Sequence, residues 1–170
     1  AHLPNKRVLA LIQKLEEISG WANRKTGSGM GMALAECFGS YTGQVVQLRK
    51  EESGSIRVQK VYCVIDCGWY VNPDIIRQQV EGSIQMGYGA AVVHETLFEG
   101  GMAVQKNFND YNMPRMGDVP EIVVHIMEND EKAGGVGEPA LPPFAPALAN
   151  AYFNLTGKRK RSLPFSLDEA

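Results

Sequence analysis

Residues 56–93, IRVQKVYCVIDCGWYVNPDIIRQQVEGSIQMGYGAAVV, place an apolar strand before a long helix and so determine the fold class. Residues 56–66 first alternate apolar and polar side chains and then become continuously apolar, so we expect this strand to enter the core. Asn72-Pro73-Asp74 predicts a helix start, because it offers a capping side chain, a proline in the first turn and an acid near the positive helix end. The predicted helix runs to about Val93.

The middle of this predicted helix carries almost no side chains on part of its surface. Its small residues are Gly82, Ser83, Gly87, Gly89, Ala90 and Ala91. Each glycine inside a helix costs about 1 kcal/mol relative to alanine. Another backbone or a ligand packed closely against this surface would offset that cost.

The rest of the chain mixes helices with hairpins. We expect a helix, a long strand, a hairpin turning at Glu99-Gly100-Gly101, a further strand and a C-terminal helix, over residues 5–20, 33–49, 95–108, 121–128 and 144–156. The long strand and residues 56–66 form a plausible antiparallel hairpin. The predicted class is therefore α+β, or mixed α/β, with antiparallel hairpins packed against the long helix and the C-terminal helix.

Composition limits the classes of function. The chain has 170 residues, 44% of them apolar and 21% charged, which suits one domain with a core. A formal charge of -2 argues against nucleic-acid binding by bulk electrostatics. No apolar run approaches the roughly 20 residues of a transmembrane helix. Neither a metal site nor an iron–sulfur cluster is predicted, because His2, His94 and His125 are scattered and Cys37, Cys63 and Cys67 form no C-x-x-C pair.

One carboxylate lies between glycines and prolines in residues 134–143, GGVGEPALPP. Pro139 restricts Glu138 to extended conformations, so Glu138 is expected on a loop rather than on a helix face. The glycines leave the backbone free to approach another group closely. A structural carboxylate is one interpretation. A general base is the other, because a desolvated pocket would raise the pKa of such a carboxylate towards working pH.

Three other motifs have simpler interpretations. Residues 135–140 match G-x-G-x-x-A, but a polar stretch precedes the glycines and prolines delay the helix, which argues against dinucleotide binding. Residues 27–31, GSGMG, lack the Lys-Ser/Thr ending of a P-loop and are interpreted as a hinge. Residues 158–161, KRKR, follow a helix end and are interpreted as a solvated surface.

Several separated motifs resemble one family. Residues 134–165, GGVGEPALPPFAPALANAYFNLTGKRKRSLPF, are similar to the C-terminal end of the molybdenum-binding large subunit of the xanthine oxidase and aldehyde oxidase family. VIDCGWYVNPDIIRQQVEGSIQMGYG (64–89) and QKNFNDYNMPRM (105–116) match the same family in the same order. The branch that these motifs resemble most is the isoquinoline 1-oxidoreductase beta subunit.

The resemblance implies a role for each site residue. Glu138 would be the active-site base of a molybdenum hydroxylase, which oxidises an aldehyde or an N-heterocycle with oxygen derived from water. Gln79 would contact the molybdopterin. Gly135, Val136 and Gly137 would bring the backbone close to the cofactor. The implied cofactor is molybdopterin with molybdenum, with the cytosine dinucleotide as one candidate form.

The family's large subunit is far longer than 170 residues, and this chain lacks its other cofactor-binding segments. Residues 1–170 are therefore expected to be a C-terminal molybdopterin-binding domain, a fragment that is inactive alone. Its expected partners are the rest of the large subunit and a small subunit carrying 2Fe-2S clusters. The resemblance to this branch favours a periplasmic location over a cytoplasmic one. The alternative is a non-catalytic assembly module that retains the fold without the cofactor.

Overall fold

The computed structural model describes residues 5–168 and is built around a four-stranded sheet with the strand order β1-β2-β3-β6. The strands are β1 (Met30–Cys37), β2 (Ser40–Lys50), β3 (Ile56–Asp66) and β6 (Glu121–Ile126). The pairs β1–β2 and β2–β3 are antiparallel, whereas β6 is parallel to β3. The predicted pairing between the long strand and residues 56–66 is confirmed as the β2–β3 hairpin.

The prediction of one strand over residues 33–49 was wrong, because a tight turn divides this stretch into β1 and β2. Phe38 and Gly39 occupy the turn with φ values of 54° and 76°. Positive φ at both positions matches the twist of the flanking strands. The turn was missed because phenylalanine rarely adopts this conformation and none of the usual Asn-Gly signals is present.

A single helix connects the parallel strands β3 and β6. This helix, α2 (Pro73–Val92), begins where predicted: the Asn72 side chain accepts hydrogen bonds from the amides of Asp74 and Ile75. Parallel neighbours need such a crossover connection because a short turn cannot return the chain to the same end of the sheet. The crossover brings the loop that follows β6 to the edge of the sheet where β3 ends.

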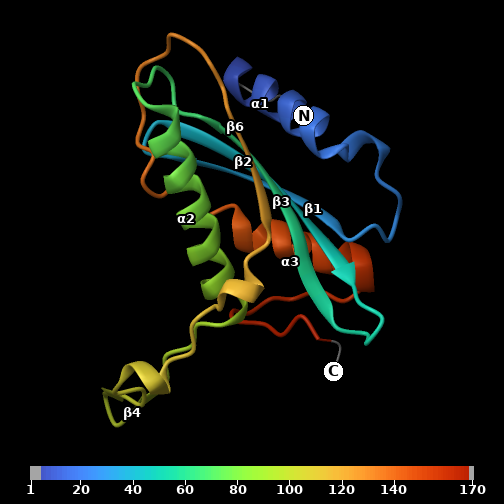
Figure 1. Cartoon of the computed structure of the whole chain (residues 1–170), viewed down its shortest axis with the longest axis vertical. Coiled ribbons are helices and arrows are strands. Elements are labelled where there is room, and N and C mark those ends of the chain that lie inside the picture. Colours follow the sequence, from blue (N-terminus) through green and yellow to red (C-terminus); the bar gives the residue numbers. More distant parts are fainter. Residues whose placement is uncertain (1–4, 169–170) are drawn as a thin grey trace.

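Helices cover both faces of the sheet (Figure 1). The N-terminal helix α1 (Lys6–Ser19) packs on one face, and α2 and α3 (Phe144–Thr156) pack on the other. Neighbouring residues of β2 show the alternation: Val45 is buried with α1, and Val46 is buried with α2 and α3. The predicted α+β class is confirmed, and the helices of the described region include none long and apolar enough to cross a membrane.

Two glycines allow close packing on the face of the sheet that α2 and α3 cover. A Cβ on Gly31 of β1 would collide with the α3 backbone at Ala147 and Ala151. A Cβ on Gly87 of α2 would lie 2.8 Å from the Cβ of Phe144. These contacts confirm that part of the small-residue surface of α2 serves close packing.

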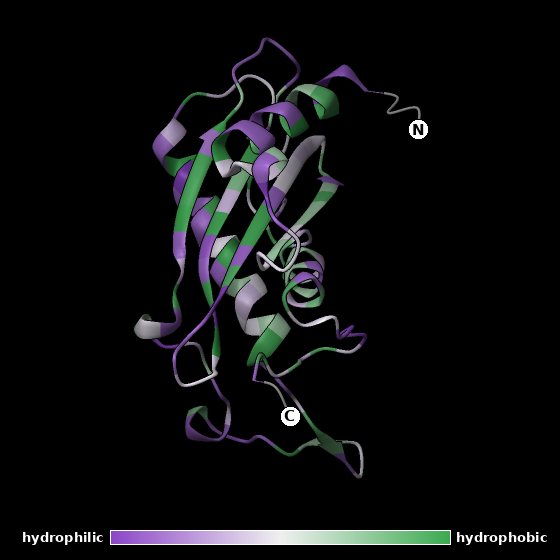
Figure 2. Ribbon diagram, turned by 90° about the vertical axis from the view of Figure 1, so that its right-hand side faces the viewer, coloured by the Kyte–Doolittle hydropathy of each residue, from purple (hydrophilic) through white to green (hydrophobic). Residues whose placement is uncertain are grey.

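An arm, defined as residues 94–120, leaves the end of α2 and returns to β6 (Figure 1). It contains the predicted hairpin as β4 (Phe98–Glu99) and β5 (Met102–Ala103), followed by the 3₁₀ turns η2 (Phe108–Asp110) and η3 (Met116–Asp118). Another 3₁₀ turn, η1 (Trp21–Asn23), follows α1. Parts of the arm are hydrophobic, as the green segments in Figure 2 show. Its exposed apolar side chains include Leu97, Phe98, Met102, Val104, Phe108, Met113 and Met116.

Candidate functional site

The site loop, defined as residues 127–143, connects β6 to α3 and carries the glycines and Glu138. Its backbone pairs with two segments of the sheet edge: the Gly134 amide donates to the Cys67 carbonyl and the Gly135 amide to the Phe38 carbonyl, both at 2.8 Å. A Cβ on Gly135 would lie 2.8 Å from the Cβ of Phe38. The close approach that the glycines predicted is therefore made here to the chain's own β1–β2 turn.

Three side chains hold carbonyl groups of the site loop on both sides of Glu138. They form one set of hydrogen bonds, from Ser40 Oγ to the Gly135 oxygen at 2.7 Å, from Ser83 Oγ to the Gly137 oxygen at 3.1 Å and from Gln44 Nε2 to the Ala140 oxygen at 2.6 Å. The donors belong to β2 and α2, both of which are packed in the core. Sequence reasoning did not find these three roles.

Glu138 lies on a loop, as predicted, and its side chain is on the exposed side of that loop. Its own carbonyl accepts a hydrogen bond from the Leu141 amide at 2.9 Å, and Pro139 and Ala140 next to it are buried. The desolvated pocket that would suit a general base is not formed by residues 5–168 alone, because the Glu138 side chain is exposed to solvent.

The structure brings Gln79 to the site loop. Gln79 lies on the exposed surface of α2, one turn before Ser83. A Cβ on Gly137 would lie 3.7 Å from Gln79 Nε2. Val136 differs from its glycine neighbours, because its side chain packs against the core and anchors the loop. Two predicted cofactor-binding residues, Gln79 and Gly137, are thus adjacent.

Three consecutive backbone amides of the site loop have no protein partner. Within residues 5–168, the backbone amides of Val136, Gly137 and Glu138 donate to no protein acceptor. A run of free amides beside an exposed glutamine amide offers several donors to an oxygen-rich ligand. The residues present therefore fit a cofactor that carries phosphate and oxo groups.

The comparisons with known proteins agree with this fit. Residues 41–120 match the family model described as the molybdopterin cofactor-binding domain. Isoquinoline 1-oxidoreductase subunit beta of Brevundimonas diminuta is 35% identical over 96% of this chain. The chain belongs to the molybdopterin cofactor-binding family. The resemblance inferred from the sequence motifs is confirmed.

Two further relatives show the range of this molybdopterin-binding family. A protein named membrane-bound aldehyde dehydrogenase [pyrroloquinoline-quinone], from Gluconacetobacter polyoxogenes, is 32% identical over 93% of this chain. The aldehyde oxidoreductase structure from Desulfovibrio desulfuricans superimposes with a TM-score of 0.61 over 74% of this chain and 14% of its own, at 26% identity. The chain spans only 22% and 21% of the length of the two curated relatives.

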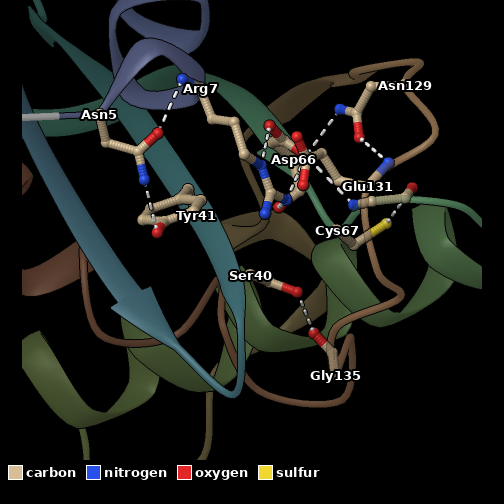
Figure 3. A network of polar contacts seen from close by, with 10 residues as sticks. Asn5, Arg7, Ser40, Tyr41, Asp66, Cys67, Asn129, Glu131 and Gly135 are labelled. Atoms are coloured by element: carbon tan, nitrogen blue, oxygen red, sulfur yellow. Dashed lines mark hydrogen bonds and ion pairs between the residues drawn. The ribbon is translucent and has the colours of Figure 1, made fainter.

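A second polar cluster fixes the edge of the molybdopterin-binding domain beside the site loop (Figure 3). The buried carboxylate of Asp66, at the end of β3, accepts two hydrogen bonds from Arg7 at 2.9 and 2.7 Å. It also accepts from Asn129 Nδ2 at 2.9 Å and from the Gly68 amide at 3.1 Å. Asp66 therefore ties α1, β3 and the start of the site loop together, a role that sequence reasoning missed.

Burial and hydrogen bonding act in opposite directions on Asp66. Desolvation by burial raises the pKa of its carboxyl, but the hydrogen bonds from Arg7, Asn129 and the Gly68 amide together outweigh it, so the pKa of Asp66 is lowered. Burial raises the pKa of the Cys63 thiol to about 12, which keeps this thiol protonated. Cys63 thus behaves as a small apolar core residue, as predicted.

The histidines lie on separate elements. His94, at the end of α2, stacks on Tyr111 of the arm with ring centroids 5.4 Å apart. His125 lies on β6, and His2 lies outside the described residues. No three His, Cys, Asp or Glu side chains gather into a possible metal site anywhere in residues 5–168.

Proposed function

We propose that this chain supplies the catalytic base, Glu138, and one wall of the cofactor site to a molybdenum hydroxylase that oxidises an aldehyde or an N-heterocycle. The observation that carries the proposal is the placement of Glu138. It is an exposed carboxylate whose neighbouring carbonyl groups are held on both sides, and its loop lies beside Gln79. Membership of the molybdopterin-binding family supports the choice of cofactor.

Different residues of this chain would bind the cofactor and accept the proton. Gln79 and the free amides of Val136 and Gly137 would bind and orient the cofactor through hydrogen bonds. When bound, the molybdenum cofactor supplies the oxygen atom derived from water and accepts two electrons from the substrate. Glu138 would accept the proton released when that oxygen is transferred, the task of a general base, which typically contributes 10²–10⁴-fold to the rate.

Other parts of the complete enzyme would finish the site. The exposed side of Glu138 leaves room for the rest of the large subunit, which would exclude water and bind the substrate. We also propose a partner subunit with 2Fe-2S clusters as the electron outlet and keep the cytosine dinucleotide as one candidate form of the pterin. That residues 1–170 form a fragment of a longer subunit stays a prediction.

The test compares Glu138→Gln with unmodified protein in the complete enzyme purified from its native host. We expect about one molybdenum per subunit in both, and turnover at least about 100-fold lower in the variant, as for a lost general base. Glu128→Gln is the matched control, because Glu128 is an exposed carboxylate of the same loop. Its turnover should be unchanged.

Two results would reject the proposal. Near-normal turnover of Glu138→Gln would remove the base assignment. An intact complex that contains no molybdenum, by elemental analysis, would point to a module that keeps the fold without the chemistry. Pyrroloquinoline quinone should be assayed on the same samples, because one relative is named for it.

A further inference from the structure

We infer that Gln44 and Ser83 are positioning residues, which set the geometry of Glu138 by holding the carbonyl groups on either side of it. The inference rests on the proposed role of Glu138 as the base. Ser83 donates to the Gly137 carbonyl, directly before Glu138, and Gln44 donates to the Ala140 carbonyl, two residues after it. Ser40 completes the set at Gly135.

The two holding side chains stand on elements that cannot shift independently of the core. Gln44 is on β2, between β1 and β3, and its side chain is fully buried. Ser83 is on the buried side of α2 and is 6% exposed. A loop fixed to a sheet on one side and to a helix on the other keeps the direction of the Glu138 side chain constant. Ser83 also lies one turn from Gln79, so it links the base to the predicted cofactor contact.

Gln44 is poorly explained by stability alone. Its Nε2 group donates to Ala140, but its Oε1 atom is buried and accepts no hydrogen bond from residues 5–168. A buried polar atom without a partner destabilises the folded state, and this offsets part of the stabilisation from the Nε2 hydrogen bonds to Ala140 and, at 3.9 Å, to Cys63 Sγ. Holding the Ala140 carbonyl is the function that an apolar residue of similar size could not perform.

Thr42 provides a matched comparison on the same strand. It lies two residues before Gln44 and therefore faces the same side of β2. Thr42 is fully buried, and its hydroxyl has no partner among the described residues. It makes no hydrogen bond to the site loop. Replacing Thr42 by valine and Gln44 by methionine thus removes a buried polar group in both cases, but only the second removes a hold on the loop.

The experiment uses the complete enzyme with Gln44→Met, Ser83→Ala and Thr42→Val as single substitutions. We expect kcat to fall by about tenfold to a hundredfold in the first two, the range for a displacement of about 1 Å. The KM for substrate should stay within about twofold, and the molybdenum content should be unchanged. Thr42→Val should keep the unmodified kcat. Ser83→Ala removes only one hydroxyl group, so it still tests the inference if Gln44→Met fails to fold.

A second readout does not depend on activity. Amide hydrogen exchange of a peptide spanning residues 134–141 should be faster in Gln44→Met and Ser83→Ala, because their loop hydrogen bonds open more often. Thr42→Val should leave this exchange unchanged. The same rate of amide exchange over residues 134–141 in all three variants would overturn the inference. Equal losses of kcat in Thr42→Val and Gln44→Met would also overturn it.

A double substitution separates this inference from the proposed function. If the hydrogen bonds from Gln44 and Ser83 act through Glu138, adding Gln44→Met to Glu138→Gln should lower kcat no further. Full additivity of the two losses would overturn the inference while leaving Glu138 as the base. Normal turnover in Glu138→Gln alone would instead reject the proposed function.

Discussion

Two carboxylates of the chain, Asp66 and Glu138, have opposite surroundings. Asp66 is buried and held by four hydrogen bonds, whereas Glu138 is exposed on a loop that is itself held. Glu138 could be found from sequence because glycines and prolines on either side of it are a local signal. The hydrogen bonds that fix the site loop and Asp66 could not be found from sequence, because Gln44 and Ala140 are 96 residues apart and Arg7 and Asp66 are 59 apart.

At the residue scale, Asp66→Asn should lower the free energy of unfolding by about 3 kcal/mol at pH 7, the low end for breaking a buried pair, because Arg7 keeps some solvent access. The folded pKa of Asp66 is lowered, so this stabilisation is present above the unfolded pKa of about 3.9 and is lost as pH falls through the folded value. Urea unfolding at pH 7 and pH 3 checks this. A difference between unmodified protein and variant that is as large at pH 3 would contradict it.

At the element scale, α2 combines two kinds of glycine. Its bounds were predicted within a residue because Asn72 and Pro73 are local signals, but which glycines pack could not be predicted. Gly87 contacts Phe144 of α3, whereas no heavy atom lies within 4 Å of a Cβ built on Gly82. The parallel pairing of β6 was also beyond the sequence, since a crossover leaves no local pattern.

Gly82→Ala and Gly87→Ala should therefore act in opposite directions on the purified chain. Gly82→Ala should raise the free energy of unfolding by up to about 1 kcal/mol through helix propensity. Gly87→Ala should lower it by about 1–2 kcal/mol, because the added methyl group overpacks against Phe144. Thermal unfolding of both variants measures the difference. Equal shifts would mean that α2 and α3 are not packed as described.

At the scale of the whole molecule, the arm differs from the layered body. Its internal hydrogen bonds are mostly local, within the β4–β5 hairpin and the turns η2 and η3, and Tyr111 stacks on His94. Much of its apolar surface is exposed. Low contact density of this kind is typical of segments that open locally.

Limited proteolysis of the purified chain should therefore cut first within residues 96–118. Peptide mapping by mass spectrometry would locate the cuts, and β3 should remain intact in the early fragments. The buried strand serves as the internal control, because β3 lies between β2 and β6. First cuts within β2 or β3 would contradict this picture.

The parallel pairing of β3 with β6 also orders the folding process. β1, β2 and β3 are joined by short turns, whereas β6 must close a long loop containing α2 and the arm before it reaches β3. Contacts between distant residues form late, because the chain first loses the entropy of closing that loop. We therefore expect Glu138, which follows β6, to reach its place last. An incompletely folded polypeptide would then expose Gln79 before Glu138, the proposed base, has reached its place.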